Sequence, residues 1–363
     1  MTSVTLKVGG RNYNGWKTAR VMRSIEAISG SFTLGVSERW ANQDELWPIN
    51  EGDSCEVLLG SAPLITGTID TRRVSYDANE HTIEVSGRDA AGALVDCSVY
   101  LERSGTKPAW EFRQISVLAF AKKICDQFSV PVSLQTGQTL SPIAKLSVDP
   151  GDTAFNAIES ACRLVGLLPI SDGRGGVLLT RSGSARCTTA LEEGKNILSA
   201  SAEYNHASKF HRYVVLGQRR GGDPEYGETV AAVKGEATDE TVSRTERVLV
   251  VRPEGNVTTE SAETRAQWEA SVRAARASTV TVTVQGWTQE SGALWPINSI
   301  VQIKSPLLAV DGPMLITQVT NTLSVSEGST TELVLKGPRS YLPEGVITRK
   351  SNDGRWREIA GGV

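Results

Sequence analysis

The chain is poor in the residues on which most enzyme and metal sites depend. It has three His and five Cys among 363 residues, and no two Cys form a CxxC pair. His81, His206 and His211 lack the HExxH spacing of a zinc site, and an odd number of dispersed thiols does not indicate a disulfide framework. We expect buried, reduced thiols, as at Cys125 and Cys162 on the apolar faces of two expected helices. There is no G-x-S-x-G elbow or P-loop either, so we predict no metal site, no cofactor and no catalytic residue.

Long apolar runs and a strong excess of one charge are missing as well. No run approaches the roughly 20 apolar residues that span a bilayer. The N-terminus, MTSVTLKVGGRNYNGW, lacks the apolar core of a signal peptide. A formal net charge of −3 excludes a chain that is basic throughout and binds nucleic acid by its bulk charge. We therefore expect a chain made in the cytoplasm, with no membrane anchor.

What the sequence does contain is many short β-strand patterns. The first ninety residues alternate between apolar and polar side chains, as in GSFTLGVSE, where Phe32, Leu34 and Val36 fall on one face. Turn residues, many of them from the 34 Gly of the chain, separate these runs. Short strands with close turn signals predict a small antiparallel barrel or sandwich.

The pattern changes to helical spacing in the middle of the chain. PAWEFRQISVLAFAKKICDQF and DPGDTAFNAIESACRLVG both have apolar residues three and four apart. Asp152 or Thr153 is the expected N-cap of the second helix and Gly166 its stop. DGRGG at 172–176 leads into a strand, so it predicts a hairpin turn and not a phosphate site. Together these signals predict a compact α+β module.

β-structure returns from about residue 196, followed by one more helix, TTESAETRAQWEASVRAARAS. Its thin apolar stripe leaves Arg265, Arg273 and Arg276 on the other positions. Two interpretations of these arginines stay open: a solvated helix face or a contact between subunits.

The pentapeptide LWPIN occurs at 46–50 and again at 294–298, and it marks a longer internal repeat. After each copy a strand, a Pro-containing turn, another strand, a polar turn and a last strand follow in the same order. PLITGTI corresponds to PMLITQV, and each copy closes on Gly plus Arg, at Gly87-Arg88 and Gly337–Arg339. Pro fixes φ near −65° and holds the preceding residue extended, so a Trp-Pro step ends a strand cleanly. The stretch is either a corner of the β-module or a place where Trp contacts a neighbouring subunit. The repeat residues that form this possible interface are Leu46, Trp47, Pro48, Ile49 and Asn50, and Leu294, Trp295, Pro296, Ile297 and Asn298.

The fold class predicted from these patterns is α+β but mainly β, with two related small antiparallel β-barrel modules and an inserted α+β segment. The expected parts are a first module, an inserted α+β module, a stretch of strands, polar loop and helix, a second module that repeats about 30–90, and a polar C-terminal tail. Their ranges are 1–98, 99–190, 191–276, 277–343 and 344–363.

Four segments, taken together and in order, resemble the central baseplate hub proteins of contractile-tailed bacteriophages, in particular those of the Mu type. They are GWKTARVMRSIEAISGSFTLGVS, GRDAAGALVDCS, SVDPGDTAFNAIESACRLVGLLPISDGRGGVLLTR and VTVTVQGWTQESGALWPINSIVQI. The resemblance covers almost the whole chain, and it is similar in plan to T4-like hubs and to the hub part of type VI secretion spikes. No single motif carries it; the ordered set does.

The resemblance implies a structural protein of the virion tail, assembled in the cytoplasm of the host bacterium. It implies a ring-shaped homotrimer in which two related barrels per chain give pseudo-six-fold symmetry to match the tail tube. Three-fold symmetry is kept for the central spike. The implied partners are further copies of the chain, tail tube or tube-initiator proteins, the spike and other baseplate proteins, with DNA only passing through a channel.

Two other functions remain open from the residues alone. A non-catalytic double-barrel module that binds a receptor or glycan would show exposed aromatic platforms, whereas the few Trp lie mostly in strand or helix patterns. A tail-associated cell-wall hydrolase would act on peptidoglycan, and the sparse His and Cys argue against it.

Overall fold

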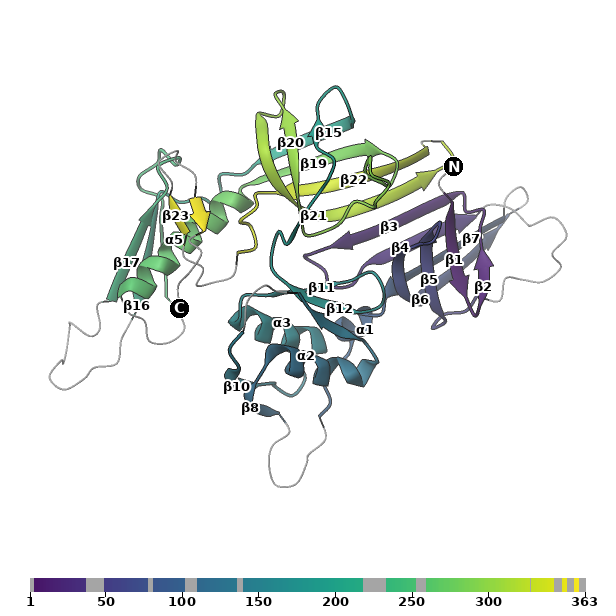
Figure 1. Cartoon of the computed structure of the whole chain (residues 1–363), viewed down its shortest axis with the longest axis horizontal. Coiled ribbons are helices and arrows are strands. Elements are labelled where there is room, and N and C mark those ends of the chain that lie inside the picture. Colours follow the sequence, from purple (N-terminus) through teal and green to yellow (C-terminus); the bar gives the residue numbers. More distant parts are fainter. Residues whose placement is uncertain are drawn as a thin grey trace. The chain divides into compact units, whose positions relative to one another are not determined.

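The computed structural model describes most of the chain, and the chain divides into two compact units. Unit 1 comprises Met1–Ser201 and Thr281–Leu335, and unit 2 comprises Ala202–Val280 and Lys336–Val363. Figure 1 traces the elements of both. The described residues are 3–36, 49–77, 81–101, 110–135, 140–217, 233–252, 259–326, 328–342, 348–350 and 356–358.

The first β-module is an antiparallel arrangement of four strands. They are β4 (Ser31–Val36), β5 (Ser54–Leu59), β6 (Ala62–Tyr76) and β7 (His81–Asp89). Their order in the sheet is β4-β7-β6-β5, and β1 (Val4–Val8) and β2 (Arg11–Tyr13) continue it beyond β5. Because successive side chains of a strand point to opposite faces, the apolar half of each strand collects on one side. Phe32, Leu34, Val57, Ile65 and Val85 are buried together there.

The second β-module repeats this plan. Its strands are β19 (Ser278–Gln285), β20 (Ser299–Ser305), β21 (Val310–Ser324) and β22 (Gly328–Lys336). They follow the order β19-β22-β21-β20, which matches the first module strand for strand. The long strands β6 and β21 have 15 residues each, and β7 and β22 have nine each. A mainly β fold with two related antiparallel modules is thereby confirmed.

Strand β3 (Thr18–Ser24) joins the two modules into one sheet (Figure 1). It pairs antiparallel with β4 on one side and with the last seven residues of β21, Gln318 to Ser324, on the other. The indole of Trp287, which follows β19, packs in the core of the first module and donates to the Thr322 carbonyl at 2.9 Å. The modules therefore share both backbone hydrogen bonds and a core.

The inserted α+β module has its own core and lies between the two β-modules in the sequence, as predicted. Phe120, Ile124, Ile158, Cys162 and Leu179 are buried at its centre. Its elements are α1 (Gly92–Asp96), β8 (Glu111–Ile115), α2 (Val117–Cys125), η1 (Asp126–Phe128), β9 (Val132–Leu134), β10 (Ile143–Ser147), α3 (Ala154–Leu164), β11 (Leu168–Ser171) and β12 (Val177–Thr180).

Local signals set the ends of the insert's elements. Thr153 caps α3, since its hydroxyl accepts from the Asn156 amide at 3.2 Å, and Gly166 follows the helix at φ +69°. The carboxylate of Asp172 accepts from the amides of Arg174 and Gly176, which closes the predicted DGRGG hairpin between β11 and β12. Each of these three predictions is confirmed.

The five Cys differ in their exposure to solvent. Cys55, Cys125 and Cys162 are buried, and burial raises the pKa of the Cys125 and Cys162 thiols to about 12. Their reactivity as thiolates is thereby suppressed. Cys97 is exposed and Cys187 half-buried, so the expectation of buried thiols is wrong for Cys97, which lies at the end of the one-turn helix α1.

Between the insert and unit 2, three short strands line the second module. β13 (Ala185–Arg186) and β14 (Leu191–Glu192) pair parallel with β20, and β15 (Ile197–Tyr204) pairs with β19. The outer edge of β20 is thus covered by a connecting segment, whereas the corresponding edge of β5 is covered by the antiparallel strand β1.

Unit 2 packs one long helix on a small sheet. Its elements are β16 (Arg212–Gly217), β17 (Val233–Thr238), β18 (Val248–Val251), α5 (Thr259–Arg276), β23 (Thr348–Lys350) and β24 (Trp356–Glu358). A Cβ on Gly235 would lie 2.2 Å from the backbone carbon of Ala262, so only glycine lets α5 approach β17 this closely.

The arginines of α5 bond to groups inside unit 2. Arg265 and Arg273 both bond to the carboxylate of Glu269, at 3.0 and 2.9 Å, and Arg276 donates to the Ser340 carbonyl at 2.7 Å. Arg265 and Arg273 are half-buried beside Glu269, so a solvated face does not describe them, whereas Arg276 is exposed as that interpretation expects. Their partners include a buried carboxylate one helical turn away and a chain segment far along the sequence.

Candidate functional site at the module joints

The second LWPIN copy forms the corner between β19 and β20. Leu294 makes a single bridge to Thr288, Trp295 is 2% exposed, and Pro296 and Ile297 are half-buried just before β20. Of the first copy, Leu46, Trp47 and Pro48 lie outside the described residues. Ile49 is fully buried in the core of the first module, and Asn50 is exposed.

Asn298, the last residue of the second copy, fastens this corner to the chain that leaves the insert. Its amide group donates to the Arg181 carbonyl at 2.7 Å and accepts from the Gly183 amide at 2.8 Å. It is 2% exposed and has φ +57°, a left-handed conformation that Asn tolerates better than most residues. Asn50 instead sits in an exposed turn closed by Asp53. Identical residues therefore occupy different environments.

Gln289 makes a second attachment of the same connecting segment. Its side-chain oxygen accepts from the Thr188 amide at 2.9 Å and the Thr189 amide at 3.3 Å, and its side-chain nitrogen donates to the Leu294 carbonyl at 3.2 Å. Glu193 adds a third attachment, accepting from the Ser305 hydroxyl at 2.6 Å. The segment 181–193 is therefore held to the second module at several points along its length.

The end of β3 makes the joint between the two modules. Arg23 donates to the Trp295 carbonyl at 3.2 Å, and the Ile25 amide donates to the Thr317 carbonyl at 2.9 Å. Burial lowers the pKa of the Arg23 guanidinium to about 10, which still leaves it charged at neutral pH. The second LWPIN corner is thus contacted by β3, the strand that joins the two modules.

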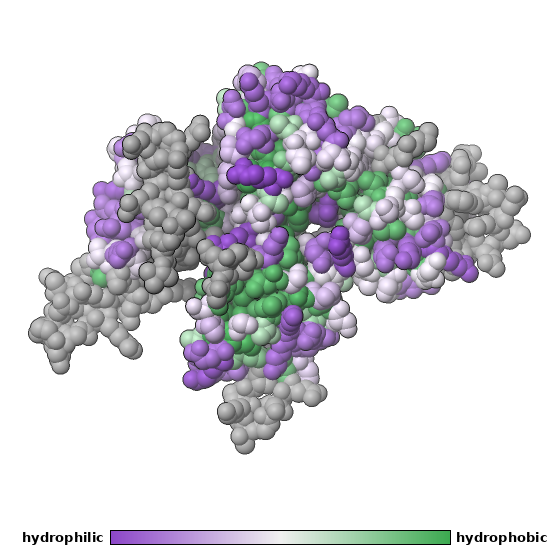
Figure 2. All heavy atoms as spheres, viewed as in Figure 1, coloured by the Kyte–Doolittle hydropathy of each residue, from purple (hydrophilic) through white to green (hydrophobic). Residues whose placement is uncertain are grey.

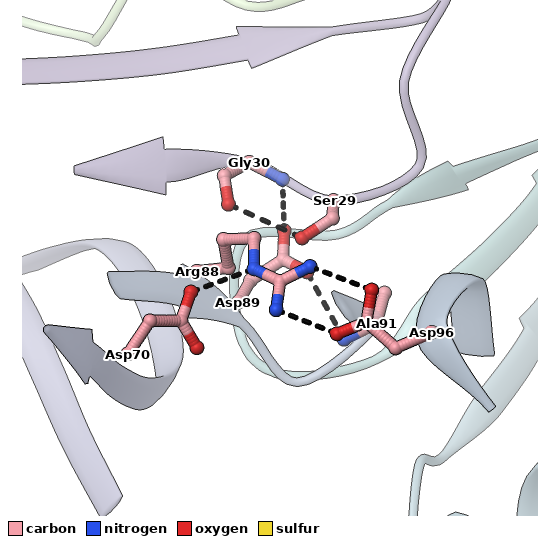
Figure 3. Close-up of polar contacts among 7 residues, drawn as sticks. All are labelled: Ser29, Gly30, Asp70, Arg88, Asp89, Ala91 and Asp96. Carbon is pink, nitrogen blue, oxygen red and sulfur yellow. Dashed lines mark hydrogen bonds and ion pairs between the residues drawn. The ribbon is translucent and has the colours of Figure 1, made fainter. Parts of the chain in front are cut away.

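The joint between the first module and the insert is polar and lies at the Gly87-Arg88 end of the repeat (Figure 3). Arg88 bonds Asp70 of β6 at 2.6 Å and both oxygens of Asp96 of α1, at 3.0 and 2.6 Å. The hydrogen bonds and the charges of both carboxylates raise the pKa of Arg88 and keep it charged. Arg88 thereby ties β6 to α1.

Asp89, next to Arg88, is 1% exposed and accepts from the amides of Gly30 and Ala91, at 2.7 and 3.0 Å (Figure 3). Burial raises the pKa of its carboxyl group to about 6, and the hydrogen bonds only partly offset this effect. Sequence reasoning missed Asp89. The signal present was an Asp two residues before the amide that it caps, in the run RDAAG.

The surface of unit 1 differs between its parts. On the face shown in Figure 2, apolar residues gather over the insert, while polar ones are interspersed over the β-modules. Leu164 of α3 and Val95 of α1 are exposed hydrophobic residues of this insert. Among the described residues, no group of three His, Cys, Asp or Glu is placed to hold a metal ion, and no helix is long and apolar enough to cross a membrane.

Three family models match successive parts of the chain. Residues 3–89 match the N-terminal domain of the Mu phage baseplate assembly protein GpP-like family, and residues 91–181 match the second domain of the baseplate hub protein gp44-like family. Residues 258–344 match the fourth domain of the Mu phage baseplate assembly protein GpP. The chain is also 29% identical over 359 residues to the baseplate hub protein gp44 of Escherichia phage Mu, covering 97% of this chain and 92% of that one.

The chain belongs to the family of Mu-like phage baseplate hub proteins. As a hub protein it is a structural component of the virion tail. Its fold agrees with that of a 43 kDa tail protein from prophage MuSo2 of Shewanella oneidensis, with a TM-score of 0.82, 27% identity, and coverage of 94% of this chain and 99% of that one.

The hub fold extends to more distant proteins. A type VI secretion component of E. coli, described as structurally similar to the T4 tail proteins gp27 and gp5, matches with a TM-score of 0.56 at 11% identity. This match covers 95% of the hub chain and 80% of the other chain. At this identity the likeness concerns the fold alone.

Proposed function

We propose that this hub protein forms a ring of three copies that adapts a six-fold tail tube to a three-fold central spike. In this ring each chain contributes two β-modules at equivalent places, so that three chains present six modules to the tube. The opposite face keeps the three-fold symmetry that the spike requires. The role is structural, and no step of it needs catalysis.

The observation that supports this proposal is the repeated strand order. The first module follows β4-β7-β6-β5 and the second β19-β22-β21-β20, with the long strands equal in length. A closed trimer has three equivalent surfaces, and it can offer six only if each chain carries a surface twice. The two LWPIN corners would then hold matching positions around the ring.

The partners follow from this geometry. Further copies of the chain complete the ring, tube or tube-initiator proteins bind its six-module face, and the spike and other baseplate proteins bind elsewhere. DNA would only pass through the central channel.

Light scattering after gel filtration tests the ring directly. A trimer has a mass of about 117 kDa, three times the 39.0 kDa of one chain, and an obligate trimer should keep it on dilution. Electron microscopy of this species should then show pseudo-six-fold rings. A stable monomer of 39.0 kDa would contradict the proposal.

A further inference from the structure

The two long strands β6 and β21 differ in the strands with which they pair. Each pairs through its first seven residues with the strand before it, Ala62 to Thr68 with β5 and Val310 to Ile316 with β20. The last seven residues of β21, Gln318 to Ser324, then pair with β3 on that same side. In the last seven residues of β6, Asp70 forms a bulge and Thr71 to Tyr76 pair with β7, and no second described strand lies beside them.

Burial follows this difference. None of the residues 318–324 in β21 is exposed, whereas six of the seven residues 70–76 in β6 are. Val74 exposes 44% of its surface and Tyr76 82%. The second half of β6 is therefore a strand edge with apolar side chains, which is the kind of edge that another strand can cover.

Strand β15 is the matching edge at the other end of the sheet. It stands next to β19 as β3 stands next to β4, and it runs antiparallel, since the Asn205 amide after β15 donates to the Ala277 carbonyl before β19 at 2.7 Å. Among the described strands β19 is its one neighbour, whereas β3 has two. Six of its eight residues are exposed, Leu198 by 56% and Tyr204 by 58%.

We propose that β15 of one copy pairs antiparallel with the second half of β6, residues 70–76, in the next copy. This pairing would repeat between chains the β3–β21 pairing that the structure shows within one chain. It rests on the proposed ring and specifies how the ring is closed.

The geometry favours a second copy of this chain as the partner. The two edges are different surfaces of one chain, so the contact is heterologous, and such contacts build closed rings or open filaments. The module repeat then identifies the strand that would pair with the second half of β6. In the second module β15 lies next to β19, as β3 lies next to β4 in the first, so β15 is the equivalent of β3. Because the end of β3 meets the start of the paired half of β21, the end of β15 should meet residues 70–72 of β6.

Charge substitutions at the two edges test the pairing. Val74→Asp and Leu198→Asp each place an uncompensated charge on an edge that is exposed in the single chain, so folding should be preserved by circular dichroism. We expect each to raise the dissociation constant of the trimer roughly 30-fold or more. Leu307→Asp, at a turn residue that is 85% exposed, is the matched control and should leave the trimer intact.

Disulfide trapping tests the register without relying on loss of assembly. In a Cys97→Ser background, Ser75→Cys is combined in turn with Ser199→Cys, Ala200→Cys and Ser201→Cys. Oxidation of one of these pairs should give covalent trimers on a denaturing gel, and the control pair of Ser75→Cys with Leu307→Cys should not.

The outcomes separate this pairing from the ring itself. A wild-type chain that stays monomeric at assembly concentrations overturns both. A wild-type trimer that tolerates Val74→Asp and Leu198→Asp and forms no cross-link overturns the pairing and leaves the ring standing. Should the aspartates be tolerated while one edge pair cross-links, the pairing is supported.

Discussion

The two β-modules of the hub protein have the same strand order, yet the chain completes them in different ways. In the second module β3 covers the end of β21, and a connecting segment lies along β20. In the first module β1 lies along β5, and the corresponding end of β6 is exposed. The duplicated module thus keeps its strand order while its edges differ, and the ring proposed above makes use of that difference.

The asparagines that end the two LWPIN copies show a similar difference at the scale of one residue. Asn298 is buried and bonds to Arg181 and Gly183, while Asn50 is exposed in a short turn. The same residue type therefore has a different role in each copy, and its neighbours decide what the side chain does.

The largest expected effect concerns a position in the first module where the backbones of β6 and β7 approach each other closely. The LIT triplet is followed by Gly67 in β6 and by Gln318 in β21. A Cβ on Gly67 would lie 2.0 Å from the Arg88 carbonyl oxygen, so Gly67→Ala must push β6 and β7 apart. We expect a loss of about 4 kcal/mol in the free energy of unfolding, measured with urea.

Gly52→Ala is the control for this substitution. Its Cβ would enter open space, so only the positive φ of +86° opposes it, at a cost of about 1 kcal/mol. Equal losses for the two variants would show that the close approach at Gly67 carries no cost of its own.

The next effect concerns Asp89. The second copy of the repeat has no buried carboxylate at the corresponding place, Pro338–Arg339. The folded pKa of Asp89, about 6, lies above the ordinary value of 3.8. Between about pH 4 and 6 the folded state keeps a proton that the unfolded state has released. The free energy of unfolding should therefore fall as pH rises through this window, by up to about 3 kcal/mol, and then level off.

Urea unfolding of wild type and Asp89→Asn from pH 4 to 7 isolates this contribution, because Asn does not titrate. The difference in stability, wild type minus variant, should decrease between about pH 4 and 6. Parallel curves over the whole range would mean that Asp89 titrates alike in the folded and unfolded chains.

A smaller effect compares the two asparagines of the repeat directly. Asn298→Ala leaves the half-buried Gly183 amide and Arg181 carbonyl without their partner and places Ala at a positive φ, so we expect a loss of about 2 kcal/mol in the free energy of unfolding. Asn50→Ala should cost less than about 0.5 kcal/mol, because the side chain is exposed.

Asn298→Gly separates the two causes, since glycine accepts the positive φ but restores no hydrogen bond. It should recover a part of the loss and not all of it. If Asn298→Ala and Asn50→Ala were equally destabilising, the attachment of the 181–184 turn would contribute nothing.

The smallest effect concerns the segments that cover β20 and β5. Glu193 accepts from the Ser305 hydroxyl and the Leu307 amide, at 2.6 and 3.1 Å, so Glu193→Ala should lower the free energy of unfolding by about 1 kcal/mol. Lys7 of β1 pairs with Glu56 of β5 in the open, with side chains 44% and 39% exposed. Lys7→Ala should therefore change the free energy of unfolding by less than about 0.5 kcal/mol. Urea titrations of both variants in parallel measure the two losses, and a larger loss for Lys7→Ala than for Glu193→Ala would contradict this expectation.

Sequence reasoning was most successful where one residue acts on its own neighbours. Thr153 as a cap, Gly166 as a helix stop and the DGRGG turn all depend on contacts within a few residues. It failed for Arg265 and Arg273 of α5, because Glu269 is charged yet buried, and burial of a carboxylate cannot be recognised from a local pattern.

The sequence by itself determined that this is a mainly β chain with a module used twice and an α+β insert between the copies. Alternation, turn residues and the LWPIN repeat are local properties, and each is written directly in the order of the residues. Only the tertiary structure decided that β3 bridges the modules, that Asn298 holds a turn more than a hundred residues away, and that the ends of β6 and β15 stay exposed. These features depend on which distant segments come together, and identical pentapeptides cannot specify different neighbours.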